Sequence, residues 1–320
     1  MRLNYIDHPV SIPVTQYEAL KTKLVKTLLA NDAVLSVYQM GSVKHPGISD
    51  LDIICVFKKG GQCAANLRPE LNADEQNILT HGVFGVEEPD LQQSMSFNLI
   101  SNLKHLGGKN LNLSDNNLNT SEDLKRQIAL EYLVKMLITI DAQVTMKIIK
   151  LRAFLLLAKA IEFDLQLLNV NQGKLYDLVQ QVIQYRNDWY ANKPNQDDVS
   201  NLILNFNIEL RQFLKKELQH AQLYLPRTLV RLPGNFSIQQ HKMFSIEHKG
   251  MVLPYQLSFL GRKYINLQNR LNSFTYKLPF EIPASGSIHE ERFQFSENMV
   301  ATNRARYPYF LPLTTSLGIY

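Results

Sequence analysis

Apolar residues recur at helical spacing through the middle third of the chain. Residues 121–172 contain no glycine or proline, and apolar side chains repeat there every three or four positions. Two such sets are Leu130, Leu133, Val134 and Leu137, followed by Val144, Ile148, Leu151 and Leu155. This spacing predicts amphipathic helices, and the stretch is too long for one ordinary helix. We therefore expect two or three helices here and further ones at 174–190 and 197–222, which together form a helical bundle over residues 121–225.

Residues 1–120 mix helix-like and strand-like patterns. Residues 15–18 (TQYE) have the form of a capping box, so a helix is expected to begin there. The strand-like segments are residues 34–40, 50–57, 82–88 and 94–100, the last of which also fits a helix. A polar stretch rich in glycine and asparagine at 107–120 predicts a domain boundary. The pattern indicates an α+β domain with a mixed sheet and flanking helices.

Residues 226–320 change character again. Prolines, aromatic residues and β-branched residues are interspersed, which predicts a region of short strands and long loops. This region carries eleven lysines and arginines against five glutamates and no aspartate. This excess could serve an anionic partner, but the cations form no dense run of the kind that indicates a nucleic-acid site, so we favour a solvated surface.

The overall composition, 45% hydrophobic and 20% charged, is that of a globular protein. The two cysteines, Cys55 and Cys63, form no CxxC pair and predict no zinc site. The first residues lack the pattern of a signal peptide, and the most apolar stretch, residues 151–163, is interrupted by Lys159 and Glu162. We therefore expect a cytoplasmic protein without a membrane span.

Two acids begin the second predicted strand. Asp50 and Asp52 are two residues apart, so on a strand their side chains point to one face, about 7 Å apart. Apolar residues follow on both faces, and two carboxylates at the edge of a core repel each other unless a cation lies between them. Mg²⁺ prefers such oxygen ligands and leaves coordination positions for substrate phosphates. Asp50 and Asp52 are therefore candidate Mg²⁺ ligands.

A glycine and a serine end the preceding strand. Gly41 allows close approach of the backbone to a phosphate, while the Ser42 hydroxyl and the N–H groups of a following helical turn can donate to phosphate oxygens. Lys44 and His45 lie in the loop that leads to the acids, and Lys44 is the stronger candidate for a phosphate contact. The segment thus combines a predicted nucleotide-binding loop with predicted metal ligands.

This segment resembles the signature of the polymerase-β-like nucleotidyltransferase superfamily. The signature is an apolar residue, Gly, Gly or Ser, a short loop, then Asp-apolar-Asp/Glu-apolar. Met40-Gly41-Ser42 and Asp50-Leu51-Asp52-Ile53 match every position. The seven residues between Ser42 and Asp50 are toward the short end of the expected spacing, and the tight form SDLD is common in the minimal and antibiotic-modifying branches. The resemblance covers residues 15–110, extends to the helical bundle only as architecture, and does not include residues 226–320.

The resemblance implies a metal-dependent nucleotidyltransferase. Such an enzyme would bind an NTP and two Mg²⁺ ions, and would move a nucleoside monophosphate to a hydroxyl or phosphate acceptor with release of pyrophosphate. The absence of a dense basic run favours a small-molecule or protein acceptor over a long nucleic acid.

The family normally has a third carboxylate on a neighbouring strand, which acts as a metal ligand and as a base toward the acceptor. The candidates here are Glu87, Glu88 and Asp90. Strand alternation puts Glu87 on one face with Val83 and Gly85, so Glu87 is the preferred ligand. The acids could equally form only a solvated turn, and His81 is then a candidate base.

Two alternatives follow if the third acid is missing or if the motif has no chemical role. One is a catalytically degenerate nucleotidyltransferase-like protein with a binding or regulatory role. The other is a helical interaction protein in which Asp50 and Asp52 merely begin a strand.

Overall fold

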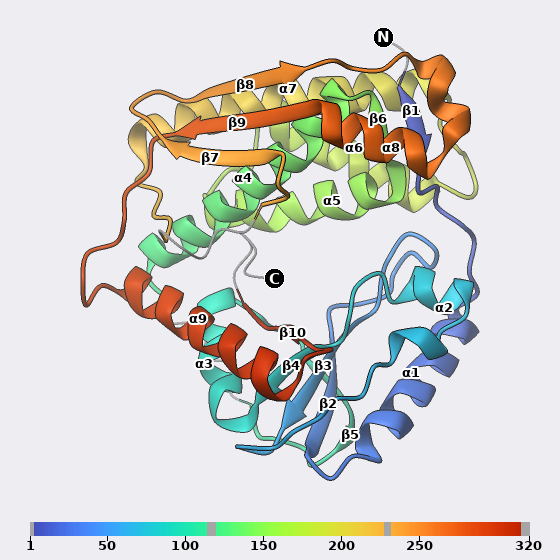
Figure 1. Cartoon of the computed structure of the whole chain (residues 1–320), viewed down its shortest axis with the longest axis vertical. Helices are drawn as coiled ribbons and strands as arrows, with labels where there is room; N and C mark the ends of the chain where they lie inside the picture. The colour runs from blue at the N-terminus through green and yellow to red at the C-terminus, as the bar shows by residue number, and fades with distance from the viewer. Residues whose placement is uncertain (1–2, 114–119, 227–231, 315–320) are drawn as a thin grey trace. The chain divides into compact units, whose positions relative to one another are not determined.

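The computed structural model describes residues 3–113, 120–226 and 232–314, and the chain folds as an α+β protein (Figure 1). It divides into two compact units, each built from two separate stretches of sequence. Unit 1 comprises Met1–Pro9 and Lys125–Pro283, and unit 2 comprises Val10–Leu124 and Ala284–Tyr320. The predicted change near residue 120 is close to this division. The C-terminal region, predicted as one block, is instead shared between the two units.

Unit 2 contains a five-stranded mixed sheet in the order β10-β4-β3-β2-β5. The strands are β2 (Val34–Met40), β3 (Asp52–Phe57), β4 (Phe84–Glu87), β5 (Lys104–Gly108) and β10 (Leu311–Pro312). Strand β2 is antiparallel to both of its neighbours, whereas β3, β4 and β10 are mutually parallel. The central strand β3 is apolar and buried on both faces, as its sequence predicts.

Helices cover both faces of this sheet. Helix α1 (Val14–Leu29) buries Tyr17, Leu20, Leu24 and Leu28 against one face, where they join Ile53, Cys55 and Phe57 of β3 in a single core. Helices α3 (Glu88–Asn98) and α9 (Ile288–Arg306) contribute Leu91, Met95 and Met299 to a second core, which includes Ile54 and Val56. We call these the α1 face and the α3/α9 face; Figure 1 shows the helices on either side of the strands.

Several predictions for unit 2 need correction. Helix α1 begins at Val14 after Pro13 and has no side-chain cap, so Thr15 lies inside the helix and the predicted capping box is wrong. Residues 94–100, which fit either a strand or a helix, lie mostly in α3. Helix α9 lies in a region for which the sequence predicts only strands and loops. Its sequence has little amphipathic character, which explains why its pattern does not reveal it.

Unit 1 contains the predicted helical bundle, formed by α4 (Glu122–Thr145), α5 (Leu151–Leu167), α6 (Lys174–Asp188) and α7 (Gln196–His220). The repeat from Val144 to Leu155 does not lie on one helix as predicted. Helix α4 ends at Thr145, Lys147 has a positive φ of 59°, and Ile148 lies in the short strand β6 (Ile148–Lys150). That strand pairs with β1 (Asn4–Ile6), which ties the first residues of the chain to unit 1.

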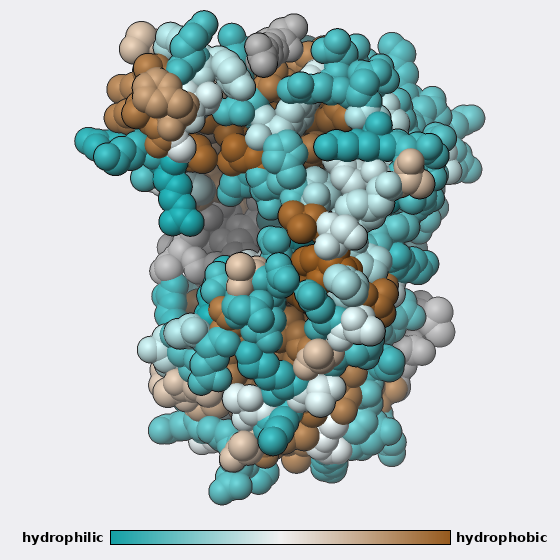
Figure 2. Space-filling view, turned by 90° about the vertical axis from the view of Figure 1, so that its right-hand side faces the viewer, coloured by the Kyte–Doolittle hydropathy of each residue, from teal (hydrophilic) through white to brown (hydrophobic). Residues whose placement is uncertain are grey.

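The rest of unit 1 is a three-stranded sheet with short helices. Its order is β7-β9-β8, formed by β7 (Phe236–Gln240), β8 (Ser245–Gly250) and β9 (Asn272–Leu278), and η3 (Tyr255–Leu260) and α8 (Arg262–Leu271) connect β8 to β9. Met251 and Phe259 are 62% and 79% exposed there. Figure 2 shows apolar side chains gathered in one upper corner of the face that it displays. Met251 and Phe259 belong to unit 1, whereas the candidate site described next lies in unit 2.

Within the described residues, no helix is both long enough and apolar enough to cross a membrane.

Short elements complete unit 2, namely η1 (Arg68–Glu70) and α2 (Ala73–Ile78). Helix α2 begins with a capping box in which Asn72 and Glu75 satisfy each other's backbone N–H groups.

Candidate metal and nucleotide site

The pairing of β2 with β3 brings the two halves of the sequence motif together. Met40, the last residue of β2, lies opposite Asp52, the first residue of β3. Gly41 and Ser42 therefore leave the sheet at the same end at which Asp50 and Asp52 enter it. Gly41 has a φ of 68°, and a Cβ placed on it would meet no atom within 4 Å. The glycine thus provides both a left-handed turn and open space for a ligand at this end.

The loop between Ser42 and Asp50 is held by a buried tyrosine of α1. The Tyr17 hydroxyl donates to the carbonyl oxygen of Ser49 at 2.7 Å and accepts from the backbone N–H of Gly47 at 2.8 Å. Ile48, at the centre of the loop, is fully buried. Ser42 and Lys44, by contrast, are exposed. No helix follows Ser42, so the predicted helical N–H donors are not present, and phosphate contacts here would come from the loop itself.

Asp50, Asp52 and His81 form a compact cluster at this end of the sheet. His81 Nε2 lies 2.7 Å from Asp52 Oδ1 and 3.8 Å from Asp50 Oδ2. One ligand atom from each residue lies within 4.8 Å of the others, and no other such group of three occurs in the described part of the chain. Thr80 donates a hydrogen bond to Asp50 Oδ2 at 3.0 Å. The arrangement can hold a metal ion through two carboxylate oxygens and one ring nitrogen.

The orientation of His81 suits a metal ligand. Its Nδ1 lies 2.8 Å from the carbonyl oxygen of Gly82, and because a carbonyl only accepts, we assign the proton of the neutral ring to Nδ1. Nε2 lies 2.7 Å from Asp52 Oδ1, which also only accepts, so without a metal the ring is protonated on both nitrogens, and a bound ion would take the place of the Nε2 proton. Histidine ligands commonly donate their other N–H to a backbone carbonyl in this way, which fixes the ring and its tautomer. The residues present therefore fit a bound divalent ion.

The charges of Asp50, Asp52 and His81 act on one another. Burial, together with the negative charge of Asp52, raises the pKa of Asp50, and His81 and Thr80 only partly offset this. Burial disfavours the charged form of His81, but the hydrogen bond to Asp52 and the charges of both aspartates outweigh it, so the pKa of His81 is raised. A proton on His81 thus supplies part of the positive charge that the two carboxylates need at this position.

Glu87, the preferred third ligand, lies elsewhere. Strand β4 is parallel to β3, and Glu87 pairs with Phe57, at the far end of β3 from Asp52. The five residue steps between Asp52 and Phe57 span about 16 Å. Glu87 also belongs to the opposite face, where it accepts hydrogen bonds from Arg306 at 2.8 Å and from Tyr307 at 3.1 Å. The prediction that Glu87 shares a metal with Asp50 and Asp52 is therefore corrected.

The other two acids near Glu87 do not reach the cluster either. Glu88 begins α3 and forms an exposed ion pair with Lys109 at 3.1 Å. Asp90 lies in the first turn of α3, where burial and the charge of Glu87 raise its pKa. The third position is taken by His81 because it directly precedes β4, which runs parallel to β3. The sequence places His81 near the expected third acid but predicts it only as a candidate base.

Comparison with known proteins adds no further information about this site. No family model, no curated protein and no solved structure matches the chain. The functional argument therefore rests on the motif and on the geometry described above.

Proposed function

We propose that unit 2 is a metal-dependent nucleotidyltransferase domain, which transfers a nucleoside monophosphate from an NTP to a hydroxyl or phosphate acceptor and releases pyrophosphate. One observation carries the proposal: the register of β2 and β3 places a Gly-Ser loop and a pair of aspartates side by side at one end of a sheet. Phosphate transfer needs this combination, because a triphosphate must be held against metal ions that neutralise its charge.

Each residue of the site has a role in this proposal. Asp50, Asp52 and His81 would hold a divalent ion, and Thr80 orients Asp50 through its hydrogen bond. Gly41 leaves room for the triphosphate, and the exposed Ser42 and Lys44 provide a hydroxyl and a positive charge beside it. A bound ion would supply charge neutralisation for the triphosphate and activation of the acceptor oxygen.

The mixed ligand set bears on the choice of metal. Two carboxylates suit Mg²⁺, whereas an imidazole nitrogen favours first-row transition metals such as Mn²⁺ or Zn²⁺. A site with Asp50, Asp52 and a third carboxylate would favour Mg²⁺ alone. We therefore propose that Mn²⁺ supports the reaction at least as well as Mg²⁺, and activity assays need both ions.

A labelling assay tests the function. The protein is incubated with each of the four α-³²P-labelled NTPs, first with Mg²⁺ and then with Mn²⁺, and a cell extract supplies the acceptor. Transfer of label by the wild type but not by the Asp50→Ala/Asp52→Ala variant supports the proposal. The size of the labelled product then identifies a small molecule, a protein or a nucleic acid as the acceptor. No transfer by the folded wild type with any NTP and either metal contradicts the proposed activity.

A second candidate function is a catalytically degenerate domain that binds nucleotide without transferring it. The observation that favours it is the position of Glu87, because the cluster then has only two carboxylates and no third acid to serve as a base. Nucleotide binding by calorimetry, together with the absence of label transfer, would support this function. Label transfer would exclude it.

A further inference from the structure

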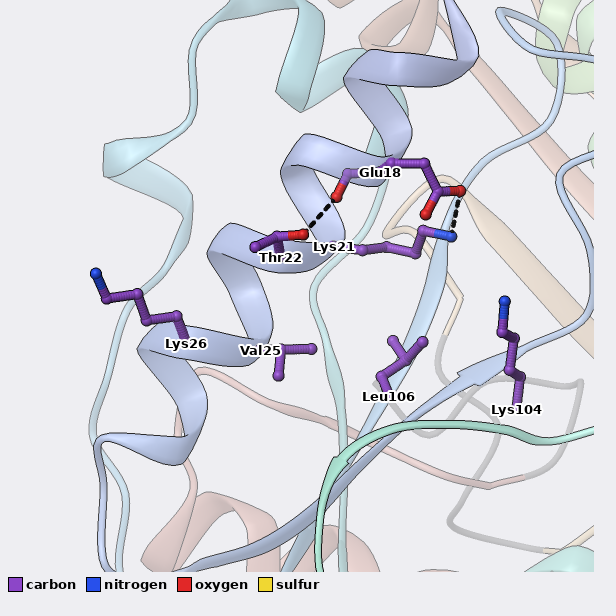
Figure 3. Close-up of a pocket in the computed structure, with 7 residues that line it drawn as sticks. All are labelled: Glu18, Lys21, Thr22, Val25, Lys26, Lys104 and Leu106. Carbon is purple, nitrogen blue, oxygen red and sulfur yellow. Dashed lines mark hydrogen bonds and ion pairs between the residues drawn. The ribbon is translucent and has the colours of Figure 1, made fainter.

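A hollow of about 350 Å³ lies between α1 and β5 on the α1 face of unit 2 (Figure 3). Its volume is within the range of small-molecule sites in proteins. Val25 and Leu106 provide an apolar surface in it, and Glu18, Lys21 and Lys104 surround this surface. In Figure 3 the side chains of Lys21 and Lys104 extend on the same side of α1, while Lys26 lies at the other end and points away from them.

This hollow is separate from the candidate metal site. Lys104 pairs with Gln39 across β2 and β5, and Leu106 packs into the core on the α1 face. Successive side chains of β3 point to opposite faces of the sheet, so Asp52 lies on the α3/α9 face together with Ile54 and Val56. The sheet itself therefore lies between the two sites.

The lining of the hollow is positively charged. It contains three lysines and one glutamate. Among the described residues, Lys26 and Lys104 have no ion-pair partner. Lys21 and Lys104 extend on one side of the hollow with Glu18 as the one acid of its lining, and two such ammonium groups form a site for an anion because each acts as a point charge toward phosphate or carboxylate oxygens.

Lys21 has the most defined position of the three lysines. Its side chain is only 10% exposed, and its Nζ donates to Glu18 Oε1 at 2.6 Å and to Gln39 Oε1 at 3.4 Å. Glu18 is 62% exposed, so it can move into solvent when an incoming anion replaces it. Gln39 in turn donates to the carbonyl oxygen of Gly41 at 3.3 Å. An anion on Lys21 would therefore bind next to the residue that holds the start of the Gly-Ser loop.

We propose that this hollow binds a small molecule that carries a phosphomonoester group. The phosphate would bind between Lys21 and Lys104, and the apolar part of the molecule would lie on Val25 and Leu106. A phosphomonoester carries close to two negative charges at neutral pH, which matches the two positive charges of Lys21 and Lys104 once Glu18 has moved into solvent. The proposal does not depend on nucleotide transfer, because the site uses no residue of the metal cluster.

Calorimetric titration with phenyl phosphate in the presence of EDTA tests this site. Phenyl phosphate joins a phosphomonoester to an apolar ring, and EDTA removes any contribution from a metal at Asp50 and Asp52. We expect binding by the wild type and about tenfold weaker binding by Lys21→Met and by Lys104→Gln, since each removes one cation but keeps the side-chain stem. Glu18→Gln should bind several-fold more tightly, because it removes the carboxylate that competes for Lys21.

Two controls keep the test specific. Lys216→Gln removes an exposed lysine from α7 in unit 1 and should leave binding unchanged. The Asp50→Asn/Asp52→Asn variant should also bind normally, so failure of the proposed catalytic function and failure of this site are distinguishable. Phenylacetate, which carries one charge, should bind more weakly than phenyl phosphate.

Three results would overturn the proposal. The first is no binding of phenyl phosphate at millimolar concentration by the folded wild type. The second is binding that survives in the Lys21→Met/Lys104→Gln double variant with its melting temperature unchanged. The third is equal affinity for phenylacetate, which would assign the hollow to carboxylates in general.

Discussion

The two ends of the β3–β4 strand pair both carry buried or half-buried acids, but in different surroundings. At one end, Asp50 and Asp52 lie beside His81, with an exposed Gly-Ser loop next to them. At the other end, Glu87 is fixed by the guanidinium of Arg306 and the hydroxyl of Tyr307. At the first end, two carboxylates share one titratable partner, His81. At the second end, the single carboxylate of Glu87 has both a permanent cation, Arg306, and a phenol hydroxyl, Tyr307, as partners. An acid with its charge fully matched is structural, and acids with unmatched charge are candidates for ligand binding.

The largest expected difference between the two ends is in catalysis. Asp52→Asn should lower label transfer by about a thousandfold or more, because it removes a charged ligand from the proposed metal site. Glu87→Gln should change transfer by no more than about twofold, since Glu87 lies about 16 Å away along β3. Both rates are measured with the same NTP, metal and acceptor.

A loss of transfer in Glu87→Gln as large as that in Asp52→Asn would contradict the comparison. A control for folding is the melting temperature, which should remain near that of the wild type in Asp52→Asn. That substitution removes the charge that strengthens the hydrogen bond from His81, but it also relieves the repulsion between Asp50 and Asp52.

The second difference is in stability, and here the order of the two ends is reversed. Glu87→Ala should lower the free energy of unfolding of unit 2 by about 2–4 kcal/mol. The substitution leaves the buried Tyr307 hydroxyl without its acceptor and Arg306 without its counter-ion. Tyr307 also stacks on Phe57 with ring centroids 3.8 Å apart, so its displacement would disturb the central strand. Hydrogen exchange of the β3 and β4 amides measures this effect locally.

An internal control is available for that experiment. Trp189 is the single tryptophan of the chain and lies in unit 1. Its fluorescence transition in denaturant reports on unit 1, so Glu87→Ala should leave it unchanged. If Glu87→Ala lowered the stability of unit 1, measured by Trp189 fluorescence, as much as that of unit 2, measured by hydrogen exchange, then Glu87 would have no special role in unit 2.

The sequence predicts the local elements of this fold better than its long-range organisation. Strands β2 and β3 and the helical bundle follow from runs and periodicities that are contiguous in the chain. The return of α9 and β10 to unit 2 does not, because α9 contains buried His289, Arg292 and Asn303 that obscure an apolar face. Arg292 donates to the carbonyl oxygen of Phe97 and Asn303 to that of Gly85, and only tertiary structure provides these hydrogen bonds.

The candidate site shows the same division. Asp50, Asp52, Gly41 and Ser42 are predicted together because a hairpin-like strand pair brings neighbouring sequence into contact. The third member depends on how β4 pairs with β3, and parallel pairing puts the residues before β4, not those after it, beside Asp52. With antiparallel pairing, Glu87 would have been close to Asp52. The segment that joins β3 to β4 is irregular, so its sequence does not indicate whether the two strands pair in parallel or antiparallel.

The third prediction concerns His81 and the metal. His81→Ala should weaken Mn²⁺ binding by about 10–100-fold, because it removes one of three ligand groups. Titration of free Mn²⁺ by electron paramagnetic resonance measures this directly, without a nucleotide. His8→Ala removes an exposed imidazole from unit 1 and serves as the matched control. Unchanged affinity in His81→Ala would leave Asp50 and Asp52 as the only ligands and would weaken the preference for Mn²⁺.

The smallest expected effect is that of Thr80, which touches the site through Asp50 alone. Thr80→Val keeps the shape of the side chain and removes the hydroxyl that donates to Asp50 Oδ2 at 3.0 Å. Mn²⁺ binding should weaken by about tenfold or less, because the ligand atoms remain and only the orientation of Asp50 is relaxed. Thr139→Val, which removes a hydroxyl bonded to a backbone carbonyl in α4, should have no effect on Mn²⁺. If Thr80→Val weakened binding more than His81→Ala, then the position of Asp50, not the ring nitrogen, would determine metal affinity, and the cluster would function as a carboxylate pair with His81 as a neighbour.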